Sequence, residues 1–236
     1  MIRAILWDVD GTLLNFEAAE KAALKHLFTE FGFPLCTDEM VKSYSKINLS
    51  YWERLERNEI TKQEVLLGRF ETFFASICID PPFAEEFNRR YQTALGDTIV
   101  FCDDSKKIVT SLKGKIPQYV VSNGTIIAQT KKLERSGFDQ LMDGIFLSEK
   151  IGVEKPNPGF FAPVFEALKG ISKDEILIVG DSLTSDIRGG VNVSIKTCWY
   201  NPKKKEAPKD LPIDYIISNL HEIFAIVTYS HHLHNS

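Results

Sequence analysis

The chain has 236 residues, roughly 1.6 times a typical domain of about 150 residues. Its 28 basic and 32 acidic residues give a net charge of −4, which argues against a dedicated nucleic-acid-binding protein, because such proteins carry a basic face. The 44% hydrophobic and 25% charged fractions exclude wholesale disorder. No apolar run approaches the 18 or more residues that span a bilayer, and the N-terminus reaches Asp8 too soon for a signal peptide. We therefore expect a cytoplasmic protein without membrane contact.

The first predicted element is a short apolar strand over residues 3–8. Residues 17–96 are then almost entirely helical in pattern, with Thr61 and Glu64 forming a capping box. Apolar positions near a 3.6-residue period predict helices over 17–33, 61–77 and 83–95.

Strands and helices alternate from about residue 97. Strands are predicted at 118–122, 144–147, 175–180, 196–200 and 214–217, and helices at 104–113, 125–136, 159–169, in a short stretch before 196, and from 219. Strands separated by helices imply a parallel sheet covered on both faces. We predict an α/β fold, in which a Rossmann-like parallel sheet core of residues 1–15 and 97–236 carries an inserted helical cap domain of residues 16–96.

Polar residues follow several of the predicted strands where each strand ends. Ligands of open parallel sheets bind beyond the carboxyl ends of the strands, near the point where strand order reverses. Each residue alone is a weak signal, because an aspartate at a strand end is more often a cap or a turn residue. Together, three strand ends and one helix start bring to one edge four acids, a hydroxyl and a lysine: Asp8, Asp10, Ser122, Lys155, Asp181 and Asp186.

The acids at this edge favour a magnesium site. Asp8 and Asp10 are two positions apart, so both can face one pocket, and with Asp181 they supply the hard oxygen ligands that Mg²⁺ prefers. No histidine lies near these strand ends, which excludes a Ser-His-Asp triad, and no Walker A loop exists.

Charge arithmetic points to phosphoryl transfer. The four aspartates and Lys155 sum to −3, a charge that would repel a phosphate group. Mg²⁺ brings the sum to −1, and protonation of one aspartate brings it to 0. A protonated acid beside an ionised nucleophile is the arrangement used by covalent phosphoryl transfer.

Four segments resemble the motifs of the haloacid dehalogenase-like (HAD) phosphatases: Asp8-Val9-Asp10-Gly11-Thr12-Leu13, Ser122-Asn123-Gly124, Lys155-Pro156, and Gly180-Asp181-Ser182 followed by Asp186. The helical insert matches the cap that this family places between its first two motifs. Three further segments, 68–71, 133–137 and 197–201, resemble the YjjG-type pyrimidine 5′-nucleotidases.

The resemblance implies a role for each motif residue. Asp8 is expected to be the nucleophile that forms an aspartyl-phosphate, and Asp10 to protonate the leaving 5′-oxygen and then activate the hydrolytic water. The phosphoryl oxygens are expected to be held by Ser122 and Lys155, with backbone donors from Asn123 and Gly124. The expected metal ligands of Mg²⁺ are the Asp8 carboxylate, the Asp10 carbonyl oxygen and Asp181, with Asp186 acting directly or through water.

The resulting expectation is an enzyme, a Mg²⁺-dependent 5′-nucleotidase that dephosphorylates pyrimidine nucleoside monophosphates, non-standard ones included, as a monomer or homodimer. A phosphatase or phosphomutase of sugar phosphates or other small phosphometabolites shares all four motifs and stays open. Asp10 counts against a 2-haloacid dehalogenase, which needs no second acid. A phosphoacceptor signalling module needs only about 120 residues and no insert, and a catalytically silent binding protein would not need every motif residue.

The predicted cap is rich in aromatic residues on which a pyrimidine ring could stack. Most of them fit a buried helix face, so we expect them to form the cap's own core and assign none as a base contact. They are Tyr51, Trp52, Phe70, Phe73, Phe74, Phe83, Phe87 and Tyr91.

Overall fold

The computed structural model describes residues 1–79 and 83–228, so the histidines at 231, 232 and 234 lie outside the described part. Six parallel strands form one sheet in the order β3-β2-β1-β4-β5-β6. The predicted α/β fold with a Rossmann-like sheet is confirmed. The strands are β1 (Ala4–Trp7), β2 (Gln118–Ser122), β3 (Gly144–Leu147), β4 (Ile176–Gly180), β5 (Lys196–Tyr200) and β6 (Tyr215–Ile217).

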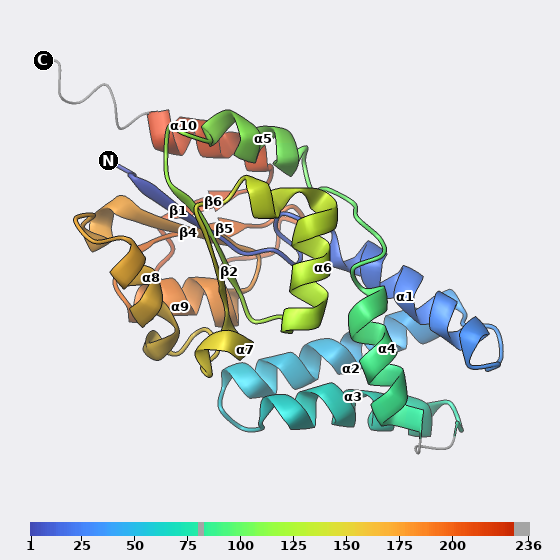
Figure 1. Ribbon diagram of the computed structural model, residues 1–236. Coiled ribbons are helices and arrows are strands. Elements are labelled where there is room, and N and C mark those ends of the chain that lie inside the picture. Colours follow the sequence, from blue (N-terminus) through green and yellow to red (C-terminus); the bar gives the residue numbers. More distant parts are fainter. Residues whose placement is uncertain (80–82, 229–236) are drawn as a thin grey trace, which may run out of the picture.

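Helices cover both faces of the sheet (Figure 1). All four residues of β1 are buried, as expected for a central parallel strand, and alternate side chains feed two separate cores. Ile5 and Trp7 pack with apolar residues of α5 (Ser105–Leu112), α6 (Ile126–Ser136) and α10 (Ile223–Thr228). Ala4 and Leu6 belong to the opposite core, which lies beneath α8 (Ala162–Ala167) and α9 (Arg188–Asn192).

The chain between β1 and β2 forms four longer helices beside the sheet (Figure 1). They are α1 (Phe16–Glu30), α2 (Asp38–Glu56), α3 (Lys62–Ser76) and α4 (Ala84–Ala94). These helices share their own hydrophobic cluster, in which Phe70, Phe73, Phe74, Phe87 and Tyr91 are buried, as expected for a cap core. The division into a core of 1–15 and 97–236 and a cap of 16–96 stays a prediction, which this separate cluster supports. Within residues 1–79 and 83–228, no helix is both long and apolar enough to cross a membrane.

Two helical segments differ from the sequence prediction. Helix α2 was not predicted as a separate element, although its apolar positions recur near a helical period; only four of its 19 residues are buried. The predicted helix 159–169 is divided, because Pro163 has no N–H to donate and fits only the first turn of a new helix. A 3-10 turn over Pro158–Phe161 therefore precedes α8, and the short helix α7 (Ser148–Ile151) follows β3.

Candidate active site

Three neighbouring strands bring the predicted residues together. Ser122 is the last residue of β2, Asp8 follows β1, and Asp181 follows β4. Because β1 pairs with β2 on one side and with β4 on the other, Asp8 lies between the other two strand ends. Strands β2 and β3 lie on one side of β1, and β4 to β6 lie on the other. The strand order therefore reverses between β1 and β4, and open parallel sheets bind ligands at such a point.

Lys155 is the cation at the centre of this edge. Its side chain is 1% exposed, and its ammonium lies 3.0 Å from Asp8 Oδ1 and 2.6 Å from Asp186 Oδ1. It also donates to the Val121 carbonyl oxygen over 2.7 Å. A buried lysine charge is tolerated only when it is paired and hydrogen-bonded, and here all three donors have a partner.

Asn123 fixes the main chain of Lys155 from two sides. Its Nδ2 donates to the Lys155 carbonyl oxygen and its Oδ1 accepts from the Lys155 amide, each over 2.8 Å. The sequence assigned Asn123 only as a source of a backbone donor, and this side-chain contact was missed. The amide of Gly124 donates to Ser122 Oγ over 3.1 Å, so this predicted donor is used within its own loop.

Asp8, Asp181 and Asp186 form a compact acidic cluster. Each offers one carboxylate oxygen, and these oxygens lie within 4.8 Å of one another. Three carboxylates and Lys155 sum to −2, and hard oxygen ligands of that charge fit a divalent cation such as Mg²⁺. Asp186 is the most constrained of the three, since its Oδ2 also accepts from the Ser182 amide over 3.1 Å.

The surroundings of the cluster disfavour negative charge. Burial raises the pKa of the Asp8 carboxyl well above its ordinary value, and nearby Asp186 adds to the effect while Lys155 opposes it. Asp181 is reachable by solvent, yet dense protein around it reduces its hydration and, with Asp186, raises its pKa to about 7. A bound cation would offset this repulsion.

Gly11 makes the approach of Asp181 possible. Its φ of +91° lies in the left-handed region, where glycine is favoured. A Cβ at this position would lie 2.6 Å from Asp181 Oδ2, a separation too short for two non-bonded atoms, so a residue with a side chain does not fit here. The glycine that follows Asp10 therefore serves both the turn and the acidic cluster.

Asp10 is placed apart from the acidic cluster. Its Oδ1 lies 2.5 Å from the ammonium of Lys132, and its Oδ2 accepts from Gln129 Nε2 over 2.5 Å. The sequence charge arithmetic is therefore corrected, because it set four acids against Lys155 alone and missed Lys132. Both partners lie within α6, where no strand end or turn marks them in the sequence.

Two side chains of the predicted cap cross to the core beside the site. Lys62, at the start of α3, donates to the Asn123 carbonyl oxygen and to Ser148 Oγ, each over 2.9 Å. Glu56, at the end of α2, accepts a hydrogen bond from the Thr184 hydroxyl. Burial raises the pKa of Glu56 to about 7, with a further increase from Asp186, while the Thr184 bond lowers it.

Glu56→Gln is expected to make stability less sensitive to pH. The folded protein holds the Glu56 proton up to about pH 7, whereas the unfolded chain releases it near the ordinary value of 4.5. The folded state thus binds more protons between these values, and this carboxyl lowers stability as pH rises through that window. The variant should gain on the order of 3 kcal/mol over the wild type between pH 5 and pH 8, as measured by urea unfolding.

Glu59→Gln is the matched control, since Glu59 is exposed and its pKa is lowered by the hydrogen bond from Arg57. It should show no such gain. Parallel pH curves for wild type and Glu56→Gln would contradict the assignment.

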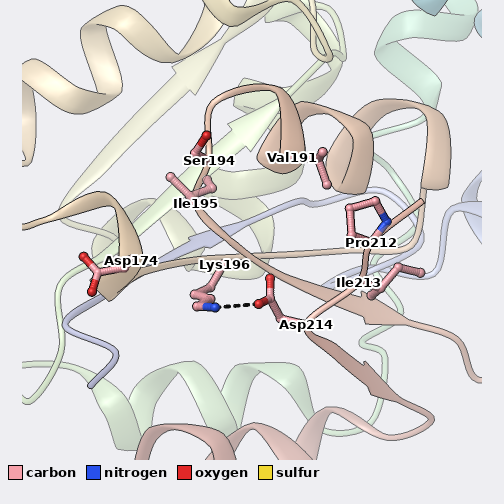
Figure 2. Close-up of a pocket in the computed structure, with 8 residues that line it drawn as sticks. All are labelled: Asp174, Val191, Ser194, Ile195, Lys196, Pro212, Ile213 and Asp214. Carbon is pink, nitrogen blue, oxygen red and sulfur yellow. Dashed lines mark hydrogen bonds and ion pairs between the residues drawn. The ribbon is translucent and has the colours of Figure 1, made fainter. Parts of the chain in front are cut away.

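A hollow of about 420 Å³ lies at the opposite end of the sheet from the acidic cluster (Figure 2). Lys196 begins β5 and Asp214 precedes β6, and their side chains pair over 2.6 Å inside it. It lies at the amino ends of these strands, whereas the acidic cluster lies at the carboxyl ends. None of the predicted site residues lines it.

Comparison with known proteins places this arrangement in a family. The model of the haloacid dehalogenase-like hydrolases matches residues 5–200. The HAD-hydrolase YfnB of Bacillus subtilis (strain 168) is 34% identical over 225 residues, which cover 95% of each chain. The crystal structure of YfnB bound to magnesium, which reveals interdomain movement, has a TM-score of 0.88 over 96% of this chain and 98% of YfnB.

Two further relatives carry a named activity. The pyrimidine 5′-nucleotidase PynA of Streptococcus pneumoniae (strain ATCC BAA-255 / R6) is 34% identical over 86% of this chain and 85% of its own. The pyrimidine 5′-nucleotidase YjjG of Escherichia coli (strain K12) is 27% identical over 93% and 95%. The resemblance inferred from the motifs is confirmed, and with a family model that extends from β1 to the end of β5, the chain belongs to the haloacid dehalogenase-like hydrolases.

Proposed function

We propose that the protein is a Mg²⁺-dependent phosphomonoester hydrolase that acts through an aspartyl-phosphate, with pyrimidine nucleoside 5′-monophosphates as substrates. The observation that most directly supports this proposal is the contact of Asp8 with the buried ammonium of Lys155, beside two further aspartates. A carboxylate in this position lies beside a cation and beside oxygen ligands for a metal ion. Phosphoryl transfer requires such positive charge next to the nucleophile. We place the enzyme in the cytoplasm as a monomer or homodimer that contacts neither nucleic acid nor membrane.

In the first step the Asp8 carboxylate attacks phosphorus, and the bond between phosphorus and the 5′-oxygen breaks. Lys155 and Ser122 hold the phosphoryl oxygens, and Asp10 gives its proton to the leaving oxygen. In the second step Asp10 takes a proton from water, whose oxygen attacks the phosphorus and frees Asp8. Asp10 thus ends the cycle with its proton restored, and the products are the nucleoside and phosphate.

The metal ligands in this proposal are the carboxylates of Asp8, Asp181 and Asp186 and the carbonyl oxygen of Asp10. When bound there, Mg²⁺ supplies charge neutralisation at the phosphoryl group. The formal charge of −2 on the cluster with Lys155 supports this assignment, as does the magnesium bound in the YfnB crystal structure. Asn123 contributes indirectly, by holding the Lys155 main chain in place.

The substrate class rests on the relatives PynA and YjjG, both of which are pyrimidine 5′-nucleotidases. The test measures phosphate release from a panel of nucleoside monophosphates, sugar phosphates and acyl phosphates, with Mg²⁺ and with EDTA. We expect release only with Mg²⁺ and the highest kcat/KM for pyrimidine monophosphates. A preference for hexose phosphates would overturn the substrate class alone, whereas no Mg²⁺-dependent release from any compound would overturn the phosphatase.

A further inference from the structure

Asp10 receives one hydrogen-bond donor on each carboxylate oxygen, and both donors come from α6. Gln129 and Lys132 are three residues apart, so they lie on the same face of that helix. Lys132 contacts Oδ1 and Gln129 contacts Oδ2, each over 2.5 Å. The Asp10 side chain itself remains 24% exposed, so part of it stays accessible from solvent.

Both donors are buried at a cost to stability. The Lys132 side chain is 2% exposed, and its ammonium, besides pairing with Asp10, lies over the ring of Phe16, 5.2 Å from the centroid. Gln129 is fully buried, and its Oε1 has no hydrogen-bond partner among residues 1–79 and 83–228. An unpartnered buried amide oxygen costs about 1–3 kcal/mol, so an apolar side chain would serve stability better at this position.

Gln129 also packs against Gly124, in the loop that follows Ser122. A Cβ at Gly124 would lie 2.2 Å from Gln129 Nε2, so any larger residue there would displace the Gln129 amide. The same side chain therefore lies between Asp10 and the loop after β2, next to the phosphoryl site of the proposed function.

We propose that Lys132 and Gln129 are positioning residues that fix the plane of the Asp10 carboxyl for its two proton transfers. A carboxyl group rotates about its bond to Cβ, and two donors on different oxygens remove that freedom. A proton donor must point at the leaving oxygen, and small errors in such alignment are costly in rate. This role rests on the proposed function, because it concerns the step in which Asp10 protonates the leaving group.

The test uses two substrates that differ in their need for a proton. The 5′-oxygen of uridine monophosphate is a poor leaving group and needs the acid, whereas p-nitrophenolate leaves without it. For Lys132→Met and Gln129→Leu we expect kcat with uridine monophosphate to fall by roughly 10²-fold. The first release of nitrophenolate in stopped flow should stay within about threefold of the wild type, followed by a slowed steady state, because hydrolysis of the intermediate also uses Asp10.

Lys131→Met is the matched control on the same helix. Lys131 pairs with Asp97 over 2.7 Å and does not contact Asp10, so its replacement should leave the turnover of both substrates unchanged. Lys132→Arg keeps the charge and should recover most of the activity with uridine monophosphate. Because the buried Lys132→Met change can lower folding yield, Gln129→Leu provides the same readout, and thermal unfolding reports the folded fraction of each variant.

Each outcome decides the proposal. An equal fall in the first-turnover release of nitrophenolate and in uridine monophosphate turnover would mean that the pair acts on the phosphoryl group or on folding, and would overturn the proposal. Unchanged kinetics in both variants would overturn it as well. A wild-type enzyme that releases nitrophenolate without forming a phosphoenzyme would instead refute the proposed function, which separates the two failures.

Discussion

Asp8→Asn is expected to lower the rate of phosphate release by on the order of 10⁴-fold or more. The amide is isosteric with the carboxylate but is not a nucleophile that can attack phosphorus. Of the neighbouring acids, Asp186 has both carboxylate oxygens engaged, Oδ1 by Lys155 and Oδ2 by the Ser182 amide. The measurement is steady-state phosphate release together with acid trapping of the phosphoenzyme, which should be absent from the variant.

Asp210→Asn serves as the control for this experiment. Asp210 is 82% exposed and lies 3.9 Å from Arg188, so the same chemical change there should leave turnover intact. A phosphoenzyme trapped in Asp8→Asn would show that the phosphoryl group is carried by another residue, and the mechanism would have to be rewritten around it.

Lys155→Met is expected to damage both stability and catalysis. Removing one partner of a buried ion pair costs roughly 3–5 kcal/mol, because the remaining charges are left without compensation. Asp8 and Asp186 would face each other and Asp181 with no cation between them. Turnover should fall on the order of 10³-fold, since a donor to the phosphoryl oxygens is lost.

The loss of stability in Lys155→Met should grow with pH. Burial already raises the pKa of Asp8 and Asp181, so at low pH these acids stay protonated and little repulsion remains. At higher pH their ionisation costs more in the variant than in the wild type, and urea unfolding at pH 5 and pH 8 measures the difference. Lys196→Met removes an exposed ion pair whose N–O distance equals that of Lys155 and Asp186. It should lower the free energy of unfolding by at most about 1 kcal/mol. Equal losses for the two variants would contradict the central role of Lys155.

The strand-end residues could be predicted because chain topology does the positioning. Once β1, β2 and β4 are placed in a parallel sheet, Asp8, Ser122 and Asp181 must converge at one edge. Lys132 and Gln129 could not be found in this way, because a buried lysine inside an amphipathic helix has the same sequence pattern as an exposed one. Asp10 lies 122 residues from Lys132 and 119 residues from Gln129, and only packing determines which face of α6 meets Asp10.

The contacts of Glu56 and Lys62 with the core could not be predicted from the sequence either. Glu56 is the last residue of a helix in which only four of 19 residues are buried, and its hydrogen-bond partner Thr184 lies 128 residues further along the chain. Lys62 looks like any charged residue in a first helical turn. Both depend on how two packed units meet, which local periodicity does not encode.

The strand order also has a consequence for the order of folding. Ile5 pairs with Gln118 and Ala4 with Ile176, so the first strand has no partner in the sheet until much later parts of the chain are present. Contacts at such separation make assembly slow, because the intervening loops must close first. Helices α1 to α4, by contrast, occupy one continuous stretch and gather their own apolar cluster. During synthesis we therefore expect the cap helices to pack early, while Asp8 remains on an unpaired strand until β2 and β4 have left the ribosome.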